Sequence, residues 1–394
     1  MLMRQVYSFD ETNIPLWVYT LFWLLYVLGF MYSVQKIFFP PNRVKFQISG
    51  SHSFYSVRKI FSPKNRVKSQ LSGSYFFLLY FILFAIFYCV NPDYFRYRDW
   101  IYGRDFGFWA KENVYIAIIY LCRSLPVSYP YEVFRLIVWG GAILIAYLSS
   151  FLYGKQLKPL IVILFLFVLF CGGFCYARAS LAMAIYFCGS SVLLNAKKKK
   201  TIILGWVIAM SSFFFHHELL IGIVVLPCIF IPFEKRKAVV ASFGIFALVI
   251  FAISFLFSNL DILTMLFGNE ELSSQIEGFN EKEQRTFRLS TLVSYMTYLY
   301  PFYLFTEIPK KKKRFPDAII GLYRLSFGII MIAIAFMFLS GVRSVFTYRI
   351  LYMSMIPISI MTAYFYNNKQ LKKDQLIVMF ILGLLTNSIR FINA

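Results

Sequence analysis

His216, His217 and Glu218 separate two apolar runs, and the chain has one other histidine, His52. Adjacent helical positions point about 100° apart, so the pair cannot hold one metal ion as residues i and i+4 would, and no HExxH motif follows. We therefore predict that one imidazole, His216, faces a cavity, where it could accept a proton from a hydroxyl group or donate to a phosphate. The alternative is a polar cap at a membrane interface, and Glu218 suits the first turn of the next helix.

Arginines dominate the cations that remain when the lysine clusters given below are set aside. They are Arg4, Arg96, Arg98, Arg104, Arg123, Arg135, Arg178, Arg285, Arg288, Arg324, Arg343, Arg349 and Arg390, joined by Lys111 and Lys282. A guanidinium group is always charged and offers a planar fork of donors that suits phosphate. The set predicts an anionic ligand, whereas single members could instead pair with acids such as Asp93, Asp99 and Asp105 or reach to lipid headgroups.

Arg178 is the most informative of these arginines. It stands in "GGFCYARASLAMAIYF", where one apolar segment ends and the next begins, and no acid lies within thirty positions on either side. A charge at the centre of a membrane helix costs about 2.5 to 3.5 kcal/mol, and less towards the interface, so it usually has a purpose. The small residues that follow allow neighbouring helices to approach closely, which favours the wall of a cavity over a lipid-facing surface.

The elements that must position these residues are membrane helices. Hydrophobic residues make up 59% of the 394 positions, charged residues 15%, and the mean hydropathy is +0.66, which excludes an ordinary water-soluble globule. A helical span needs about 20 mostly apolar residues. We predict an all-α polytopic membrane protein, a single integral-membrane domain over residues 1–394, with about twelve transmembrane helices at 14–33, 75–90, 130–153, 158–175, 178–195, 201–215, 218–233, 238–258, 289–306, 318–340, 347–365 and 375–392.

Lysine and arginine clusters occupy every second connection. They lie within residues 34–73, at Lys155 and Lys158, at Lys197 to Lys200, at Lys235 to Lys237, at Lys310 to Arg314, and at Lys369, Lys372 and Lys373. Because cationic loops stay in the cytoplasm, both termini are predicted on the outer, extracytoplasmic side, with long outer loops at 91–129 and 259–288. The formal charge of +22 then indicates contact with anionic membrane lipid and no nucleic-acid partner.

The basic loop at 34–73 contains a tandem duplication of 23 residues. "YSVQKIFFPPNRVKFQISGSHSF" from Tyr32 precedes "YSVRKIFSPKNRVKSQLSGSYFF" from Tyr55, and sixteen aligned positions are identical. An exposed loop tolerates such an insertion. We interpret it as a duplication without catalytic meaning, the alternative being attachment to anionic lipid.

Aromatic residues gather in the first outer loop. Tyr97, Trp100 and Tyr102 could stack on sugar rings, or they could anchor a half-inserted helix at the membrane interface. The six cysteines are scattered and mostly lie in apolar segments, which favours a packing role. No metal ion or other cofactor is predicted.

Four motifs in order along residues 75 to 365 resemble the EpsG branch of the Wzy-type bacterial polysaccharide polymerases. They are the outer loop "DYFRYRDWIYGRDFGFWAKENVYIAIIYLCRSL" from Asp93, "RASLAMAI" from Arg178, "FHHELLIG" with His216 in the histidine position, and "GVRSVFTYRILYMSMIP" with Arg343 or Arg349. The chain departs from the family at Ala179, where glutamine is frequent, and at Glu218, where serine or threonine is usual.

This resemblance implies a metal-independent glycosyltransferase at the outer face of the bacterial cytoplasmic (inner) membrane. It would join polyprenyl-diphosphate-linked oligosaccharide repeat units into an exopolysaccharide, capsule or O-antigen. The resemblance places Arg178, together with either Arg343 or Arg349, on the leaving diphosphate, with Arg96 and Arg98 of the outer loop as further candidates. His216 ranks first as the base for the attacking hydroxyl, followed by Asp99, and a chain-length regulator and a flippase of the same pathway are the implied partners.

Two other classes stay open. A flippase or transporter of lipid-linked glycan would also expose arginines to diphosphate, but it needs charged residues along a path through the bilayer, and the predicted segments hold almost none at mid-depth. A polysaccharide ligase shares the sidedness and chemistry of a polymerase. A membrane acyltransferase would need its histidine reachable from the cytoplasm, whereas His216 is predicted outside.

Overall fold

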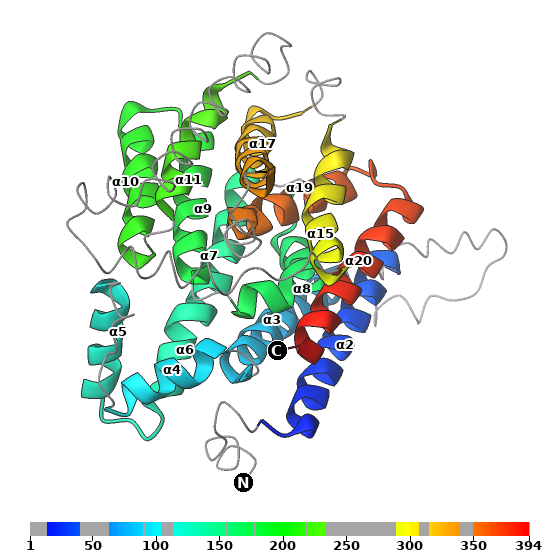
Figure 1. Ribbon diagram of the computed structural model, residues 1–394. Coiled ribbons are helices and arrows are strands. Elements are labelled where there is room, and N and C mark those ends of the chain that lie inside the picture. The colour runs from blue at the N-terminus through cyan, green and yellow to red at the C-terminus, as the bar shows by residue number, and fades with distance from the viewer. Residues whose placement is uncertain are drawn as a thin grey trace, which may run out of the picture.

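The computed structural model describes residues 14–39, 63–89, 92–103, 113–154, 157–176, 179–216, 219–232, 289–306, 315–338 and 350–393, and every regular element in these ranges is helical. The helices, labelled as in Figure 1, are α2 (Leu16–Phe38), α3 (Pro63–Phe87), α4 (Pro92–Ile101), α5 (Asn113–Ser124), α6 (Pro130–Arg135), η2 (Leu136–Gly140), α7 (Gly141–Ser150), η3 (Phe151–Tyr153), α8 (Pro159–Tyr176), α9 (Ser180–Leu194), α10 (Lys199–Phe215), α11 (Leu220–Val225), η5 (Leu226–Phe230), α15 (Leu289–Phe305), α17 (Asp317–Phe338), α19 (Met355–Asn367) and α20 (Lys373–Asn393). The all-α prediction is confirmed for this part of the chain.

Each predicted membrane segment except 238–258 overlaps a described helix, and residues 238–258 lie outside the described ranges. Within those ranges, three helical stretches are long and apolar enough to cross a membrane: Leu16–Phe38, Pro130–Tyr153 and Asp317–Ile334. Shorter apolar helices accompany them, at Tyr75–Phe87, Val114–Ser124, Pro159–Cys175, Ser180–Leu194 and Leu220–Phe230. The structure thus agrees with a membrane protein, while the number of twelve spans stays a prediction.

Helix α8 forms the centre of the core. From Val162 to Cys171 no side chain is more than 2% exposed, so the helix is surrounded by protein on all sides. This follows from its sequence, because a helix that is apolar around its whole circumference is stable only in a buried position. Helices α2, α7, α19 and α20 pack against it.

A polar side chain joins α8 to two of its neighbours. Asn387 of α20 is fully buried, and its amide accepts from the Gly172 N–H at 2.7 Å and donates to the carbonyl oxygen of Val168 at 3.1 Å. It also donates to the hydroxyl of Tyr26 on α2, at 3.0 Å. Since an unpaired amide in an apolar core would be costly, this set of bonds fixes how α2, α8 and α20 are positioned along one another.

Helices α9 and α10 cross at two glycines. A Cβ atom added to Gly189 would lie 2.3 Å from the backbone nitrogen of Ala209, and one added to Gly205 would lie 2.8 Å from the nitrogen of Leu193. No side chain fits at these points, so small residues allow the two backbones to touch. The two helices run antiparallel through this crossing. His216, at the end of α10, and Ser180, at the start of α9, lie a similar number of residues from it, so both lie at the same end of the helix pair.

Gly189→Ala is expected to lower the free energy of unfolding by about 1 to 3 kcal/mol, because the added methyl group forces the two backbones apart. Thermal unfolding of the protein in detergent would measure the loss. Gly141→Ala is the matched control, since its added Cβ would lie 3.7 Å from Leu181 Cδ1, an ordinary contact. Equal stability of the two variants would contradict the close crossing.

The helical bundle has two chemically different ends. We call the end that contains His216 the histidine end, and the end that contains Lys158, Lys197 to Lys200 and Lys369 the lysine end. Contacts between Phe165 and Tyr366, and between Gly172 and Asn387, show that α19 runs antiparallel to α8 and that α20 runs parallel to it. The hydrogen bond from Trp23 to Ser388 then brings the beginning of α2 beside the end of α20, at the histidine end.

Helices α4, α5 and α6 form a layer at the histidine end. In Figure 1, they lie below the lower ends of α9 and α10. The contacts of α5 with α4, α6 and α10 agree with this view. The described part of the predicted outer loop 91–129 therefore contains two helices, whereas the predicted loop 259–288 lies outside the described residues.

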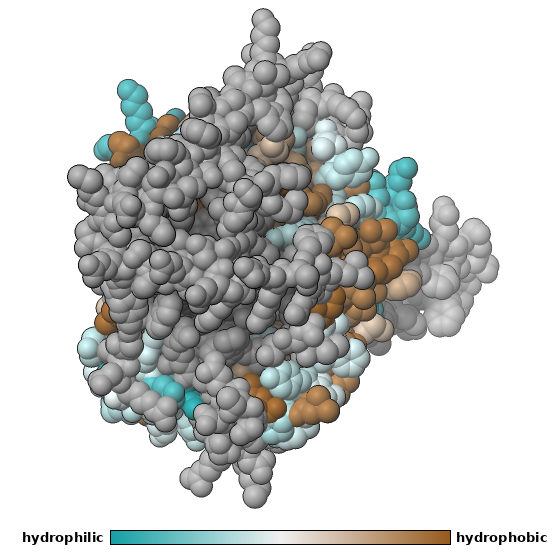
Figure 2. All heavy atoms as spheres, viewed as in Figure 1, coloured by the Kyte–Doolittle hydropathy of each residue, from teal (hydrophilic) through white to brown (hydrophobic). Residues whose placement is uncertain are grey.

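Large apolar side chains are exposed around the sides of the bundle. They include Leu28 and Met31 on α2, Val207 and Phe214 on α10, and Ile381 and Leu385 on α20. Figure 2 shows such apolar side chains on the face in view. Exposure of this extent is expected where lipid, and not water, surrounds the helices.

Candidate functional site

The connection between α8 and α9 carries Arg178. Arg178 lies outside the described residues, but the helices on both sides of it are described. The hydroxyl of Ser180, at the start of α9, donates to the carbonyl oxygen of Phe174 in the last turn of α8. This bond holds the two helix ends close together at the histidine end.

His216 ends α10 at the same level. Its backbone is extended, with φ −157° and ψ 115°, and its N–H donates to the Ser212 carbonyl at 3.1 Å. The side chain is only 4% exposed. The predicted base is therefore enclosed by protein, four residues before α11 begins at Leu220, while His217 and Glu218 lie outside the described residues.

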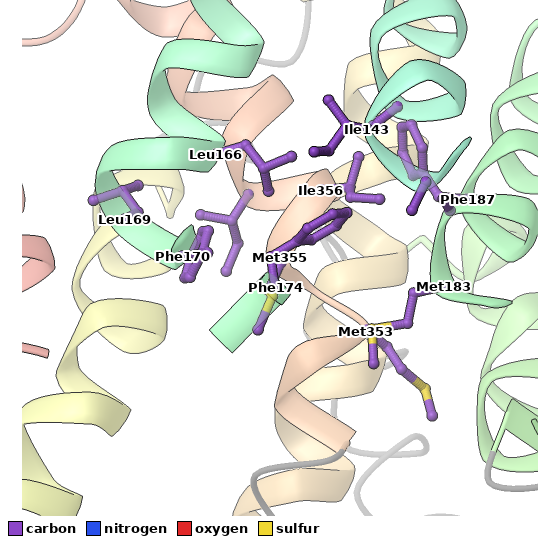
Figure 3. Packing of buried hydrophobic residues seen from close by; sticks show 14 of the residues in the cluster. Ile143, Leu166, Leu169, Phe170, Phe174, Met183, Phe187, Met353, Met355 and Ile356 are labelled. Atoms are coloured by element: carbon purple, nitrogen blue, oxygen red, sulfur yellow. The ribbon is translucent and has the colours of Figure 1, made fainter. Parts of the chain in front are cut away.

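The beginning of α19 completes this group of helix ends. Figure 3 shows Phe174 of α8, Met183 of α9 and Met355 of α19 in one apolar cluster, together with Met353, which comes shortly before α19. All four are at most 5% exposed. Arg343 and Arg349, which precede this segment in the sequence, lie outside the described residues.

Tyr186 joins the first half of α9 to α11. Its hydroxyl donates to the carbonyl oxygen of Gly222 at 2.7 Å, and the ring is 1% exposed. A Cβ atom added to Gly222 would lie 3.3 Å from both this ring and the sulfur of Met353. Helices α9 and α11 and the Met353 segment therefore meet at one place, close to the ends that flank Arg178, His216 and Arg349.

Tyr186→Phe is expected to lower the free energy of unfolding by about 1 kcal/mol, because it removes one buried hydrogen bond. It should also reduce activity, since α11 loses its fixed position beside the start of α9. Tyr153→Phe is the matched control: the Tyr153 hydroxyl lies 3.1 Å from the Ser191 hydroxyl, at the lysine end. The two variants should lose similar stability, and equal activity would mean that the Tyr186 bond has no positioning role.

The aromatic residues predicted to bind sugar occupy different environments. Tyr97 and Trp100 are buried at 1% and 6% exposure and pack edge to face, with ring centroids 5.1 Å apart. Tyr102, at 51%, is the exposed one of the three predicted residues. Partial burial raises the pKa of Tyr102, whose protonated hydroxyl can donate a hydrogen bond.

Tilted and edge-to-face rings connect this outer layer to the helix that precedes His216. Tyr115 of α5 has its ring centroid 6.2 Å from that of Tyr97 and 6.5 Å from that of Phe215. Phe215 directly precedes His216. The structure thus connects the α4 residues to the neighbourhood of the histidine through a layer of aromatic side chains.

Arg98 and Asp99 form an ion pair at the end of α4. The distance from Arg98 Nη2 to Asp99 Oδ1 is 3.5 Å, and the side chains are 14% and 29% exposed. Both side chains are therefore only partly exposed. The backbone of Arg96 lies in α4, but its side chain is outside the described part. The roles of Arg96, Arg98 and Asp99 stay predictions.

Arg135 has a structural role that the sequence did not reveal. It is fully buried, and its guanidinium donates to the carbonyl oxygens of Ile86, Ala85 and Tyr88 at 2.5, 2.7 and 2.8 Å. These carbonyls end α3, where the helix dipole favours a cation. The group also lies 4.5 Å from the centre of the Trp139 ring. The sequence feature that could have indicated this role is the position of the arginine within an apolar segment.

One of three comparisons with known proteins found a match. The profile of the EpsG family matches residues 71–392, which is most of the chain. Neither the curated proteins nor the solved structures contained a match. The match covers every described helix from α4 to η5 and from α15 to α19, and so includes all the helix ends that meet around Arg178 and His216. The chain therefore belongs to the EpsG family.

Proposed function

We propose that this protein polymerises polyprenyl-diphosphate-linked oligosaccharide repeat units at the outer face of the bacterial cytoplasmic membrane. EpsG family membership favours a polymerase-like role in polysaccharide synthesis. The observation that carries the proposal is the meeting of the helix ends that flank Arg178, His216 and Arg349 at one end of the bundle. In this proposal the histidine end faces outward and the lysine end faces the cytoplasm.

The proposed reaction is one displacement. A sugar hydroxyl of one lipid-linked unit attacks the anomeric carbon of the growing chain, a new glycosidic bond forms, and the bond from the anomeric carbon to the diphosphate oxygen breaks. The hydroxyl proton passes to a base, and negative charge develops on the departing polyprenyl diphosphate. Arg178 and Arg343 or Arg349 would stabilise that charge, as preorganised donors do at developing anions.

His216 is the proposed base. Its low exposure supports this role, because an imidazole enclosed by protein is shielded from bulk water. Asp99 is the alternative, and its carboxylate forms an ion pair with Arg98. Neither role requires a metal ion.

The test is a deletion strain complemented with the wild-type gene. Polymerase function predicts that the deletion strain displays single repeat units outside the cytoplasm and lacks long-chain glycan, and that complementation restores the long chains. Units that remain on the cytoplasmic face would identify a flippase, and long chains that stay lipid-linked would identify a ligase. Unchanged glycan in the deletion strain would contradict all three functions.

A further inference from the structure

A side chain from another helix holds the last part of α8. The Asn387 amide of α20 accepts from the Gly172 N–H at 2.7 Å and donates to the Val168 carbonyl oxygen at 3.1 Å. In a regular α-helix these two backbone groups are each other's partners, because residue 172 donates to residue 168. The amide therefore binds both members of one backbone donor–acceptor pair of α8.

The backbones of α8 and α20 touch one turn earlier. A Cβ atom added to Gly383 would lie 2.5 Å from the Val168 carbonyl oxygen, so no side chain fits between the helices there. Since α20 runs parallel to α8, four further residues on each helix bring Asn387 level with Gly172. The Tyr26 hydroxyl accepts from Asn387 at 3.0 Å and donates to Val168 at 3.1 Å. Asn387 and Tyr26 are both 0% exposed, so water cannot replace these bonds.

The last turn of α8 depends on bonds from outside the helix more than the rest of α8 does. Gly172 and Gly173 are consecutive, and each destabilises a helix by about 1 kcal/mol relative to alanine. Phe174 packs in the apolar cluster of Figure 3, but apolar contacts are not directional. Directional bonds come from Asn387 at Gly172 and from Ser180, whose hydroxyl donates to the Phe174 carbonyl oxygen.

This turn leads directly to Arg178. Helix α8 ends at Tyr176 and α9 begins at Ser180, so the connection that carries Arg178 is three residues long. Gly172 lies four residues before the end of α8, roughly 6 Å along the helix axis. Because the connection is short, a shift of the last turn of α8 must move the backbone of Arg178.

We propose that Asn387 is a positioning residue for the transfer reaction: by holding the last turn of α8, it fixes where the Arg178 guanidinium meets the diphosphate. The inference rests on the proposed function for the role of Arg178. Asn387 touches neither the substrate nor the reacting atoms. Its loss acts on turnover more than on substrate binding, because Arg178 stabilises charge that develops only in the transition state.

Hydrogen exchange and transfer kinetics test the inference on the full chain in lipid nanodiscs. Asn387→Leu keeps the approximate size of the side chain and removes its amide. Backbone amides of residues 172–176 should exchange roughly tenfold faster in this variant. With lipid-linked repeat units extracted from the deletion strain as substrate, kcat should fall roughly tenfold while KM stays unchanged.

Thr386→Val is the matched control. Thr386 is the neighbouring residue on α20, and its buried hydroxyl lies 2.6 Å from that of Thr297 on α15. This variant should lose similar stability but keep wild-type kcat and wild-type exchange at residues 172–176. Tyr26→Phe removes one hydroxyl from the Asn387 network and keeps the inference testable if Asn387→Leu does not fold. It should speed the same exchange and lower kcat severalfold.

A double-mutant cycle identifies the route by which Asn387 acts. If it acts through Arg178, Asn387→Leu should lower kcat less in the Arg178→Lys background than in wild type, whereas independent effects would multiply. Multiplying effects would overturn the inference, as would wild-type kcat or wild-type exchange in the folded Asn387→Leu and Tyr26→Phe variants. Absence of elongation by the wild-type protein would refute the proposed function, while the exchange rates would still decide whether Asn387 holds the end of α8.

Discussion

Arg178→Ala is expected to eliminate long-chain glycan in the complemented deletion strain, while single lipid-linked repeat units accumulate outside the cytoplasm. The guanidinium is proposed to stabilise the charge that develops on the leaving diphosphate. Removing one such donor typically slows a reaction by about 10² to 10³, or roughly 3 to 4 kcal/mol. The size distribution of lipid-linked and surface glycan measures the effect.

Arg178→Lys separates charge from geometry in the same assay. Lysine keeps the charge but not the planar fork of donors, so short chains are expected, intermediate between the alanine variant and wild type. His216→Ala should reduce chain length as well, because the attacking hydroxyl loses its proposed base. Lys199→Ala, an exposed residue at the lysine end, is the control. Wild-type chain lengths in folded Arg178→Ala protein would refute the assignment of this residue.

Arg135→Met is expected to destabilise the protein by about 3 to 5 kcal/mol, the range found when one partner of a buried charged network is removed. Three carbonyl groups at the end of α3 would lose their donor in an apolar environment. The chain enters α4 directly after this point, so the outer layer should lose its position too. Thermal unfolding in detergent and the cellular protein level measure the loss.

A lysine at position 135 tests how much of the stability comes from the charge alone. Arg135→Lys keeps the charge near the helix end, but an ammonium group cannot reach three carbonyls with a fixed fork, so partial destabilisation is expected. Lys372→Met, an exposed change at the lysine end, should leave stability within about 0.5 kcal/mol of wild type. If Arg135→Met changed the stability as little as this surface variant does, the hydrogen bonds of Arg135 to the end of α3 would not stabilise the protein.

Membership of the EpsG family could be inferred from short motifs because their order along the chain, and not any single one, carried the signal. The family match over residues 71–392 confirms it. The ranges of the helices were also close to the prediction, since uninterrupted apolar segments of this length form helices in a membrane. The side of the membrane that each end faces and the individual site residues stay predictions.

The sequence by itself determined that the chain is helical, apolar and divided into a lysine end and a histidine end, because composition and loop charge depend only on which residues occur where. It did not determine which helices touch. Helix α8 is apolar on every side, so no pattern marks the faces that meet α2, α19 and α20, and Asn387 and Tyr26 lie more than 350 positions apart.

Only the tertiary structure assigned partners to the polar residues in apolar segments. Arg135 looked like one of thirteen arginines available to a ligand, yet the fold uses its donors on α3. Glu132 gave no signal in the sequence, and the fold leaves one of its buried oxygens without a described donor. The physical reason is common to both: a buried polar group acquires its role from the partners that packing brings within hydrogen-bond distance.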